Sequence, residues 1–190
     1  MPDLNEKFKR THKPQRQTQK QRFHQGWFVP KYHPEKWLTK MNRFMSEWEL
    51  KVMDLLDRSD KILRCASEPI AIEYKNPLKN FEYCIKNNLD WKNPIYWKTA
   101  LYYPDLWIEL LQNDGSVRKI FIEIKPYNQS VAPKMPPPGS KVSAFRTYNK
   151  LAMDFLVNQQ KWEAAKQFCE ARGTEFCVMT EITLKQLGLL

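Results

Sequence analysis

The residues best suited to chemistry lie in one stretch, YYPDLWIELLQNDGSVRKIFIEIKP, residues 102–126. Its apolar pattern predicts two strands around a turn, with Asp105 near the start of the first strand and Glu123 near the end of the second. Two neighbouring carboxylates repel each other by roughly 4 kcal/mol at about 4 Å and an effective dielectric near 20. A divalent cation reverses this repulsion, because Mg²⁺ takes hard oxygen ligands. The stretch therefore predicts a metal site, provided that both side chains share one face of the hairpin.

The turn decides whether they share a face. A two-residue turn at Asp114-Gly115 would put the two carboxylates on opposite faces. A three-residue loop at 113–115, with Gly115 in the left-handed conformation, places Asp105 opposite Glu123. That register also pairs Trp107 with Phe121, Glu109 with Lys119, Leu106 with Ile122 and Ile108 with Ile120. Each such pair is favourable by about 0.2–1 kcal/mol, so the sequence favours the register that brings the carboxylates together.

Lys125 follows Glu123 by two residues and therefore projects to the same face. Its ammonium can hold a water molecule or a phosphate oxygen beside the metal. An Asp, a Glu and a Lys on one face form a site that generates hydroxide and stabilises charge on a phosphate. Charges on a hairpin can also simply face solvent, but the second strand, KIFIEIKP, is too apolar for an exposed strand. We therefore expect a functional site rather than a solvated hairpin.

The charge of the chain favours a polyanionic partner. The 190 residues carry a net charge of +10, and residues 1–40 hold ten Lys or Arg against three Asp or Glu, a net of +7. A basic segment without apolar periodicity is typical both of a solvated tail and of a nucleic-acid arm, and the charge alone does not separate the two. No apolar run is long enough for a transmembrane helix, no secretory signal is visible, and the four cysteines lack zinc-ligand spacing.

The order of expected elements predicts an α/β fold with a mixed sheet. Helical spacing begins near Ser46. Residues 75–99 show no clear period and contain Asn-Pro twice, so we expect a long loop or insertion there. The other expected elements are an ordered aromatic arm at 26–37, extended segments at 61–74, a hairpin at 100–125, an irregular connection at 126–141, a helix at 143–172, a strand at 175–181 and a final short helix.

Glu49 has two interpretations. Ser46-x-x-Glu49 is a capping box, in which the Glu49 carboxylate would reach back to the backbone N–H of Ser46. Alternatively, the first turn of this helix contributes Glu49 to a site on the sheet. The residue types alone favour the cap, and one rotamer cannot fully serve both purposes.

Pro104-Asp105 followed by Glu123-Ile124-Lys125 resembles the motif of the PD-(D/E)XK nuclease superfamily. Further stretches are similar to successive blocks of the tailed-phage head completion nucleases, which are in turn similar to TnsA-type transposon endonucleases. Besides the hairpin, these stretches are residues 26–37, 43–57, 66–77 and 158–181.

The resemblance implies a restriction-endonuclease-like fold, in which helices flank a mixed β-sheet core behind a basic N-terminal extension. We expect a basic, partly flexible arm at residues 1–40 and a nuclease domain at 41–190, with an insertion at about 75–100. The resemblance also favours Glu49 as an acid of the active site, with Ser46 still capping the helix.

The same resemblance implies roles for the site residues. Mg²⁺, or Mn²⁺ in its place, would be held by Asp105, Glu123 and the Ile124 carbonyl, with Glu49 bound directly or through water. Lys125 would orient the nucleophilic water.

The long helix offers further polar side chains for DNA, namely Asn158, Gln160 and Lys161. Asn158 and Lys161, one turn apart, resemble a polar stripe that lies near the site in this family. We expect Lys161 to contact a phosphate.

By resemblance, we expect a DNA endonuclease that trims or processes packaged DNA ends during phage head completion, in the virion or the host cytoplasm. Its partners would be double-stranded DNA and portal or neck proteins. Two alternatives remain. One is a TnsA-like or restriction-like endonuclease, although no specificity domain is recognisable. The other is a structural, DNA-binding neck or portal protein with a vestigial site, although Asp105, Glu123 and Lys125 are all present.

Overall fold

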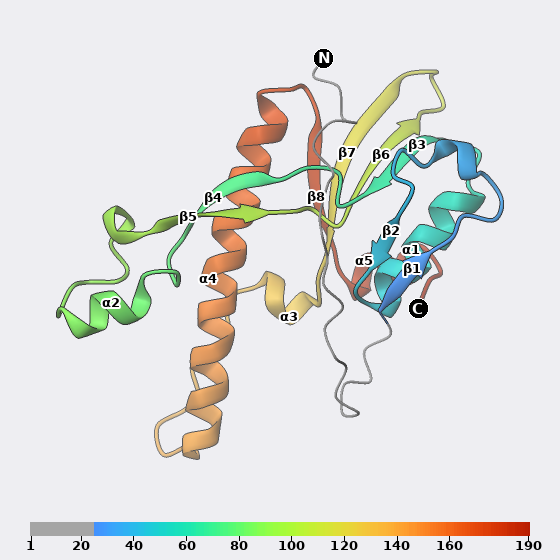
Figure 1. Ribbon diagram of the computed structural model, residues 1–190. Helices are drawn as coiled ribbons and strands as arrows, with labels where there is room; N and C mark the ends of the chain where they lie inside the picture. Colours follow the sequence, from blue (N-terminus) through green and yellow to red (C-terminus); the bar gives the residue numbers. More distant parts are fainter. Residues whose placement is uncertain (1–24) are drawn as a thin grey trace.

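The computed structural model describes residues 25–190, and residues 1–24, which hold most of the basic tail, lie outside it (Figure 1). Its centre is a four-stranded sheet in the order β3-β6-β7-β8. The strands are β3 (Ile62–Ser67), β6 (Leu106–Leu111), β7 (Val117–Ile124) and β8 (Glu175–Met179). Strand β6 is antiparallel to both β3 and β7, and β8 runs parallel to β7. The predicted α/β fold with a mixed sheet is confirmed.

Helices cover both faces of this sheet, because its strands alternate apolar side chains between two cores. On one face, Leu106 and Ile122 pack against Val52 of α1 (Glu47–Arg58) and Leu184 of α5 (Glu181–Gln186). On the other face, Trp107 and Phe121 pack against α4 (Val142–Glu170) through Cys169 and Phe168. Asp105 and Glu123 continue the row of Trp107 and Phe121, so the carboxylates belong to the face that α4 covers.

The predicted register of the hairpin is confirmed. Leu106 pairs with Ile122, Trp107 with Phe121, Ile108 with Ile120 and Glu109 with Lys119. The loop has three residues, because the N–H of Gln112 donates to Ser116 and Gly115 adopts a φ of 84°. Glycine enters this left-handed region without steric strain, whereas a two-residue turn at Asp114-Gly115 would need a positive φ at Asp114 as well, which Asp114 does not have.

The first strand of the predicted hairpin at 100–125 was wrong, because the chain forms two separate strands there instead of one. β5 (Lys98–Tyr102) pairs with β4 (Ile72–Asn76) and leaves the sheet, and β6 begins only at Leu106. Pro104 explains the break, since it has no N–H to donate to a neighbouring strand. Asp105 therefore sits where the chain passes from one strand pair to the other.

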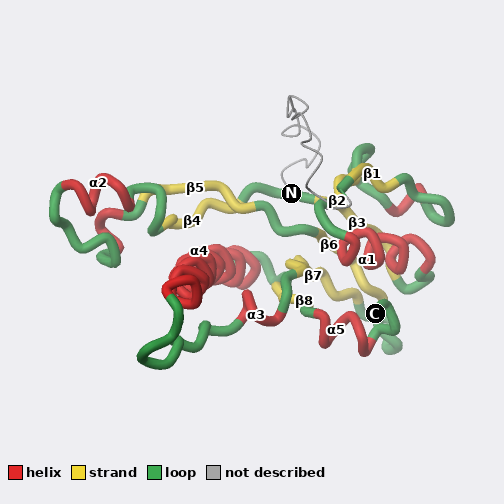
Figure 2. Tube along the Cα trace, turned by 90° about the horizontal axis from the view of Figure 1, so that it is seen from below, coloured by secondary structure: helices red, strands yellow, loops and turns green. Residues whose placement is uncertain are grey.

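For residues 75–99 we expected a long loop or an insertion, and of these the long loop was wrong. The segment contains α2 (Phe81–Lys86) and a 3-10 helix (Pro94–Tyr96), with Phe81 packed edge-on against Trp91. Helices of six and three residues are too short to show a period in sequence. The β4-β5 ribbon passes over α4 and carries α2 at its far end (Figure 2).

The other elements agree with their expectations. Helix α1 begins after Ser46, and α4 fills the expected helix at 143–172. The connection at 126–141 is irregular except for α3 (Tyr127–Ser130). In the aromatic arm, β1 (Gly26–Phe28) pairs with β2 (Asn42–Phe44), and a 3-10 helix (Pro34–Lys36) precedes the buried Trp37.

Asp57, at the end of α1, fastens this arm to the domain. Its carboxylate accepts hydrogen bonds from the backbone N–H groups of Lys31, Tyr32 and His33, at 2.7, 3.0 and 3.2 Å, and from the indole N–H of Trp37 at 3.2 Å. Burial opposes ionisation of Asp57, but these four donors together hold its pKa below the ordinary value of 3.8. The arm is therefore packed on the domain, as its aromatic residues predict.

We expect Asp57→Ala to lower the free energy of unfolding by about 2–4 kcal/mol, because it leaves buried N–H donors without an acceptor. Since the pKa of Asp57 is lowered on folding, its contribution is complete above pH 3.8 and is lost as the pH falls through the lowered value. Urea denaturation from pH 7 to pH 3 measures both effects. Asp54→Ala, which breaks only an exposed pair with Arg58, is the control and should change stability by less than about 1 kcal/mol. Equal losses in the two variants would contradict this role.

Candidate active site

Asp105 is held beside Glu123 by the backbone of β7. The Oδ2 atom of Asp105 accepts a hydrogen bond of 2.7 Å from the N–H of Ile124, the residue that follows Glu123. Burial, and next the charge of Glu123, raise the pKa of Asp105 well above its ordinary value. The sequence-based prediction that these two acids are neighbours is confirmed, and their proximity destabilises two negative charges at once.

Glu123 is 2% exposed and accepts two short hydrogen bonds. The Tyr102 hydroxyl donates to its Oε2 atom at 2.6 Å, and the Lys125 ammonium lies 2.9 Å from its Oε1 atom. Sequence reasoning missed Tyr102, because its position depends on β5 leaving the sheet. The nearest signal was the short distance in sequence between Tyr102 and Asp105.

Lys125 stands directly after β7 and shares the face of Glu123, as predicted. Burial alone would lower its pKa, but Asp105 and Glu123 outweigh that effect and raise the pKa above its ordinary value. Lys125 is therefore an ammonium in this arrangement. It can donate hydrogen bonds to a water molecule or a phosphate oxygen, but it is not poised to remove a proton.

Glu49 caps its helix and also lies within electrostatic reach of the acids and the lysine on the sheet. Its backbone N–H donates to the Ser46 hydroxyl oxygen, the Ser46 hydroxyl donates to Oε1, and Oε2 accepts from the N–H of Met45 at 2.7 Å. The Glu49 carboxylate therefore reaches back to the N–H of Met45, one residue before the Ser46 N–H that the capping box predicts. Burial raises the pKa of Glu49, and its charge interacts with Lys125 and Glu123. The capping residue therefore lies near the sheet site.

Lys161 of α4 approaches the site from the helix layer that covers this face of the sheet. The Lys161 ammonium lies 5.7 Å from the centre of the Tyr102 ring and 5.9 Å from that of Tyr74. Burial lowers its pKa, while Glu123 and Asp105 favour its charged form. Asn158, one turn away, is buried and lines a cavity with Lys161. Gln160, which was predicted to bind DNA together with Asn158 and Lys161, does not line that cavity, because residues two apart on a helix face different sides.

The site residues supply oxygen ligands for a divalent cation. In the described part of the chain, no three His, Cys, Asp or Glu side chains form a group that could hold a metal, so Glu49 does not join the two other acids as a ready-made ligand. Asp105 and Glu123 remain as the carboxylate pair, and the Oδ1 atom of Asp105 accepts no hydrogen bond from residues 25–190. The buried Glu123 and the half-buried Asp105, with one adjacent ammonium, fit a hard cation such as Mg²⁺ or Mn²⁺, which offsets the repulsion between the two carboxylates.

Comparisons with known proteins agree with this geometry. Residues 59–181 match the family described as TnsA-like endonuclease N terminal. The matched range includes both carboxylates of the sheet site, Lys125 and Lys161, but not Glu49. The chain is also 29% identical over 145 residues to the head completion nuclease of Enterobacteria phage T4, which covers 76% of this chain and 82% of that protein.

These matches confirm the resemblance on which the sequence-based expectations rest. The family match covers the four strands of the central sheet, β3, β6, β7 and β8, together with most of the residues that face one another at the site. The mixed sheet, the flanking helices and the carboxylate pair are consistent with a restriction-endonuclease-like fold. The chain therefore belongs to the TnsA-like endonuclease family, and it is a nuclease.

Proposed function

We propose that the protein is a divalent-metal-dependent DNA endonuclease whose active site is formed by Asp105, Glu123, Lys125 and Glu49. One observation carries the proposal: Asp105 and Glu123 meet on the face of the sheet that α4 covers, with the Lys125 ammonium 2.9 Å from Glu123. A structural hairpin gains nothing from two neighbouring carboxylates on a face that a helix covers, whereas a metal-dependent hydrolase requires such a pair.

Each residue has a distinct role in this proposal. Asp105 and Glu123, with the Ile124 carbonyl, would hold Mg²⁺ or Mn²⁺, and Glu49 would bind it directly or through water. When bound, the metal activates water for in-line attack on phosphorus and neutralises charge on the phosphate. Lys125 orients that water and stabilises the developing charge. Tyr102 holds Glu123 in place through the 2.6 Å hydrogen bond to its Oε2 atom.

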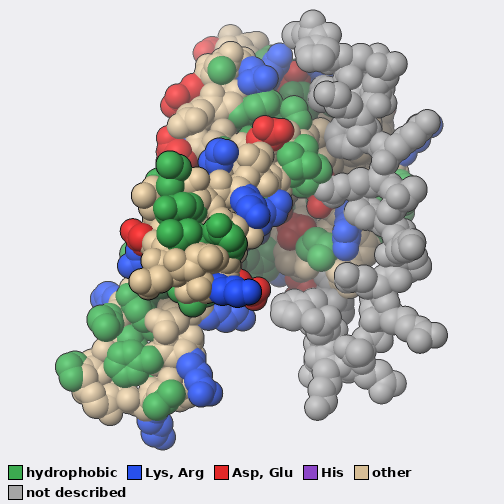
Figure 3. All heavy atoms as spheres, turned by 60° about the vertical axis from the view of Figure 1, so that its left-hand side comes forward, with side chains coloured by type: hydrophobic (Ala, Val, Ile, Leu, Met, Phe, Trp, Pro, Cys, Tyr) green, Lys and Arg blue, Asp and Glu red, His purple; other side chains and the backbone are tan. Residues whose placement is uncertain are grey.

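Polar groups on α4 and a basic surface would guide the DNA to this site. Lys161 of α4 lies beside the Tyr102 ring, and we assign it to a phosphate contact, while Asn158 lines the adjoining cavity. Figure 3 shows Lys and Arg side chains predominating over Asp and Glu on the lower half of the face drawn. Such a surface suits double-stranded DNA, whose phosphates dominate non-specific affinity.

The similarity to the T4 head completion nuclease supports a place in phage assembly. We propose that the protein trims or processes packaged DNA ends as the head is completed, in the host cytoplasm or within the virion, beside portal or neck proteins. None of the helices at residues 25–190 has the length and apolar character needed to span a membrane.

Incubation of the purified protein with supercoiled plasmid tests this function. We expect cleavage with Mg²⁺ or Mn²⁺ and none with EDTA, because the carboxylate pair needs a cation to act. Cleavage that persists undiminished in EDTA would contradict the metal role.

A structural virion protein with an inactive site is the second candidate. It would explain the hydrogen bonds from Tyr102 and Lys125 to both oxygens of Glu123. Each of these oxygens keeps a second lone pair that could bind a metal, however, so the two hydrogen bonds are compatible with either candidate. The same plasmid assay separates the candidates, since a structural protein binds the plasmid without cutting it under any metal.

Deleting residues 1–24 removes seven Lys or Arg residues and should flatten the dependence of DNA affinity on salt. Each phosphate contact adds about 0.9 to the slope of log affinity against log salt concentration. Fluorescence anisotropy with one DNA duplex, at salt concentrations from about 50 to about 300 mM, measures this slope. Metal-dependent cleavage at low salt should survive, because every proposed ligand lies elsewhere. An unchanged slope would show that the tail binds something other than DNA.

A further inference from the structure

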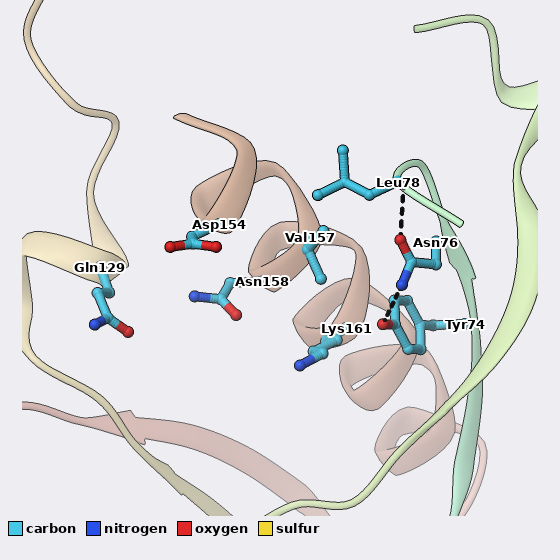
Figure 4. A pocket seen from close by; sticks show the side chains of 8 residues that line it. All are labelled: Tyr74, Asn76, Leu78, Gln129, Asp154, Val157, Asn158 and Lys161. Atoms are coloured by element: carbon cyan, nitrogen blue, oxygen red, sulfur yellow. Dashed lines mark hydrogen bonds between the residues drawn. The ribbon is translucent and has the colours of Figure 1, made fainter. Parts of the chain in front are cut away.

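A cavity of about 490 Å³ lies beside the candidate active site, between β4, α3 and α4. In Figure 4, Asp154 and Asn158 point from α4 toward the side where Gln129 of α3 lies, and Asn76 and Tyr74 of β4 stand on the other side. The volume falls within the range of about 300–1,000 Å³ that is typical of small-ligand sites. The cavity is thus large enough for one nucleobase or nucleotide.

Asn158 shows that the cavity is built for a polar ligand. Its side chain is 7% exposed and lines the cavity, yet its amide makes no hydrogen bond with any residue of 25–190. Among the buried side-chain N and O atoms of residues 25–190, only the Trp162 indole nitrogen lacks a partner, so the Asn158 amide is open to the cavity and free to hydrogen-bond a ligand there. By contrast, the amide of Asn76 is fully used, since it donates to the Tyr74 hydroxyl at 2.9 Å and accepts from the N–H of Leu78 at 2.8 Å.

The other residues that line the cavity indicate which kind of ligand it can bind. Tyr74, Leu78 and Val157 form an apolar wall, and Asn158 and Gln129 offer amide donors and acceptors. This combination suits a flat heterocycle whose edge carries both kinds of group. Lys161 can hold a phosphate where the cavity adjoins the site, but the Asp154 carboxylate, which also lines the cavity, disfavours a second phosphate inside it.

Lys161 connects the cavity to the site of cleavage. It lines the cavity, and its ammonium lies 5.7 Å from the ring of Tyr102, whose hydroxyl is bound to Glu123. A phosphate held by Lys161 would therefore join a base in the cavity to a phosphodiester at the carboxylates.

We propose that this cavity binds one unpaired nucleobase of the strand that is cut, next to the scissile phosphate. This inference rests on the proposed function as a DNA nuclease and names the substrate more closely. A base stacked and paired in a duplex cannot enter such a cavity without leaving the helix, which requires unstacking and unpairing. The enzyme therefore prefers DNA with an unpaired nucleotide, such as a frayed or overhanging end, over continuous duplex.

The test compares two DNA hairpins of one sequence in EDTA, where binding is measured without cleavage. One carries a single unpaired adenine, and the other an abasic site at that position. By fluorescence anisotropy, we expect the full-length protein to bind the adenine hairpin about tenfold more tightly, because stacking and hydrogen bonds to one base are worth that much. Equal affinities would overturn the base site. A failure of the nuclease proposal would appear separately, as the absence of cleavage with any metal.

Filling the cavity should remove the preference. Val157→Phe places a ring inside the cavity and should reduce the ratio of affinities to below about twofold. Met153→Phe is the matched control, since Met153 lies one turn away on α4 and lines a neighbouring cavity instead. It should keep the tenfold ratio. A folded Val157→Phe protein that retains the preference for the adenine hairpin would contradict the proposal. If that variant does not fold, the wild-type comparison and the Asn158→Leu variant decide the question. Asn158→Leu removes only the unpartnered amide and should also reduce the ratio of affinities.

Discussion

Asp105→Asn is expected to reduce metal-dependent cleavage at least about 10³-fold while leaving the protein as stable as before or more stable. The amide oxygen can still accept the hydrogen bond from the N–H of Ile124, so the backbone geometry is kept. The substitution removes one of two neighbouring charges, and Asp105 is destabilised as a charge, since burial and Glu123 raise its pKa. Initial rates of plasmid nicking and urea denaturation without metal measure the two effects.

Loss of activity without loss of stability distinguishes a functional acid from a structural one. Asp114→Asn provides the control, because Asp114 lies in the turn of the same hairpin and bonds only to Ser116. Its cleavage rate should stay within about twofold of wild type, as for most surface substitutions. A rate for Asp105→Asn within tenfold of wild type would remove Asp105 from the catalytic site.

Lys125→Ala is expected to reduce cleavage at least about 10²-fold, because water orientation and charge stabilisation in the transition state are both lost. Lys125→Arg should not restore the rate, since a planar guanidinium cannot replace a compact ammonium against Glu123. Circular dichroism and the urea midpoint report whether the fold is retained, and single-turnover cleavage reports the chemical step.

The matched control for this prediction is Lys119→Ala, at the other end of β7. Lys119 faces Glu109 at 3.7 Å, far along the strand from the carboxylate pair. Because Arg64 already binds Glu109 at 2.5 Å, this substitution should change neither activity nor stability greatly. Near-normal cleavage by Lys125→Ala would contradict a catalytic role, and Lys125 would then only neutralise the charge of Glu123.

The parts of the site that sequence predicts are those fixed by local rules. The left-handed Gly115 and the cross-strand pairs of Trp107 and Glu109 suffice to set the register, and the register places Asp105 beside Glu123. The alternation of side chains along a strand then puts Lys125 on the same face. None of these inferences needs a contact between distant segments of the chain.

What sequence cannot predict here depends on tertiary packing. The departure of β5 from the sheet follows from its pairing with β4, and that pairing alone brings Tyr102 to Glu123. Asn158 could be predicted as polar and near the site, but the cavity that it lines exists only because β4 packs across α4. Glu49 shows the same limit, since a capping box cannot reveal which other charges approach it.

Binding of Mn²⁺ measured by isothermal titration calorimetry tests the central claim most directly. The claim is that Asp105 and Glu123 together hold a divalent cation, and binding requires neither DNA nor turnover. We predict saturable binding to the wild-type protein, weakened at least about tenfold in Asp105→Asn and unchanged in Asp114→Asn, because loss of one carboxylate ligand from a small site weakens the cation strongly. Equal Mn²⁺ affinity in the wild-type and Asp105→Asn proteins would contradict the account.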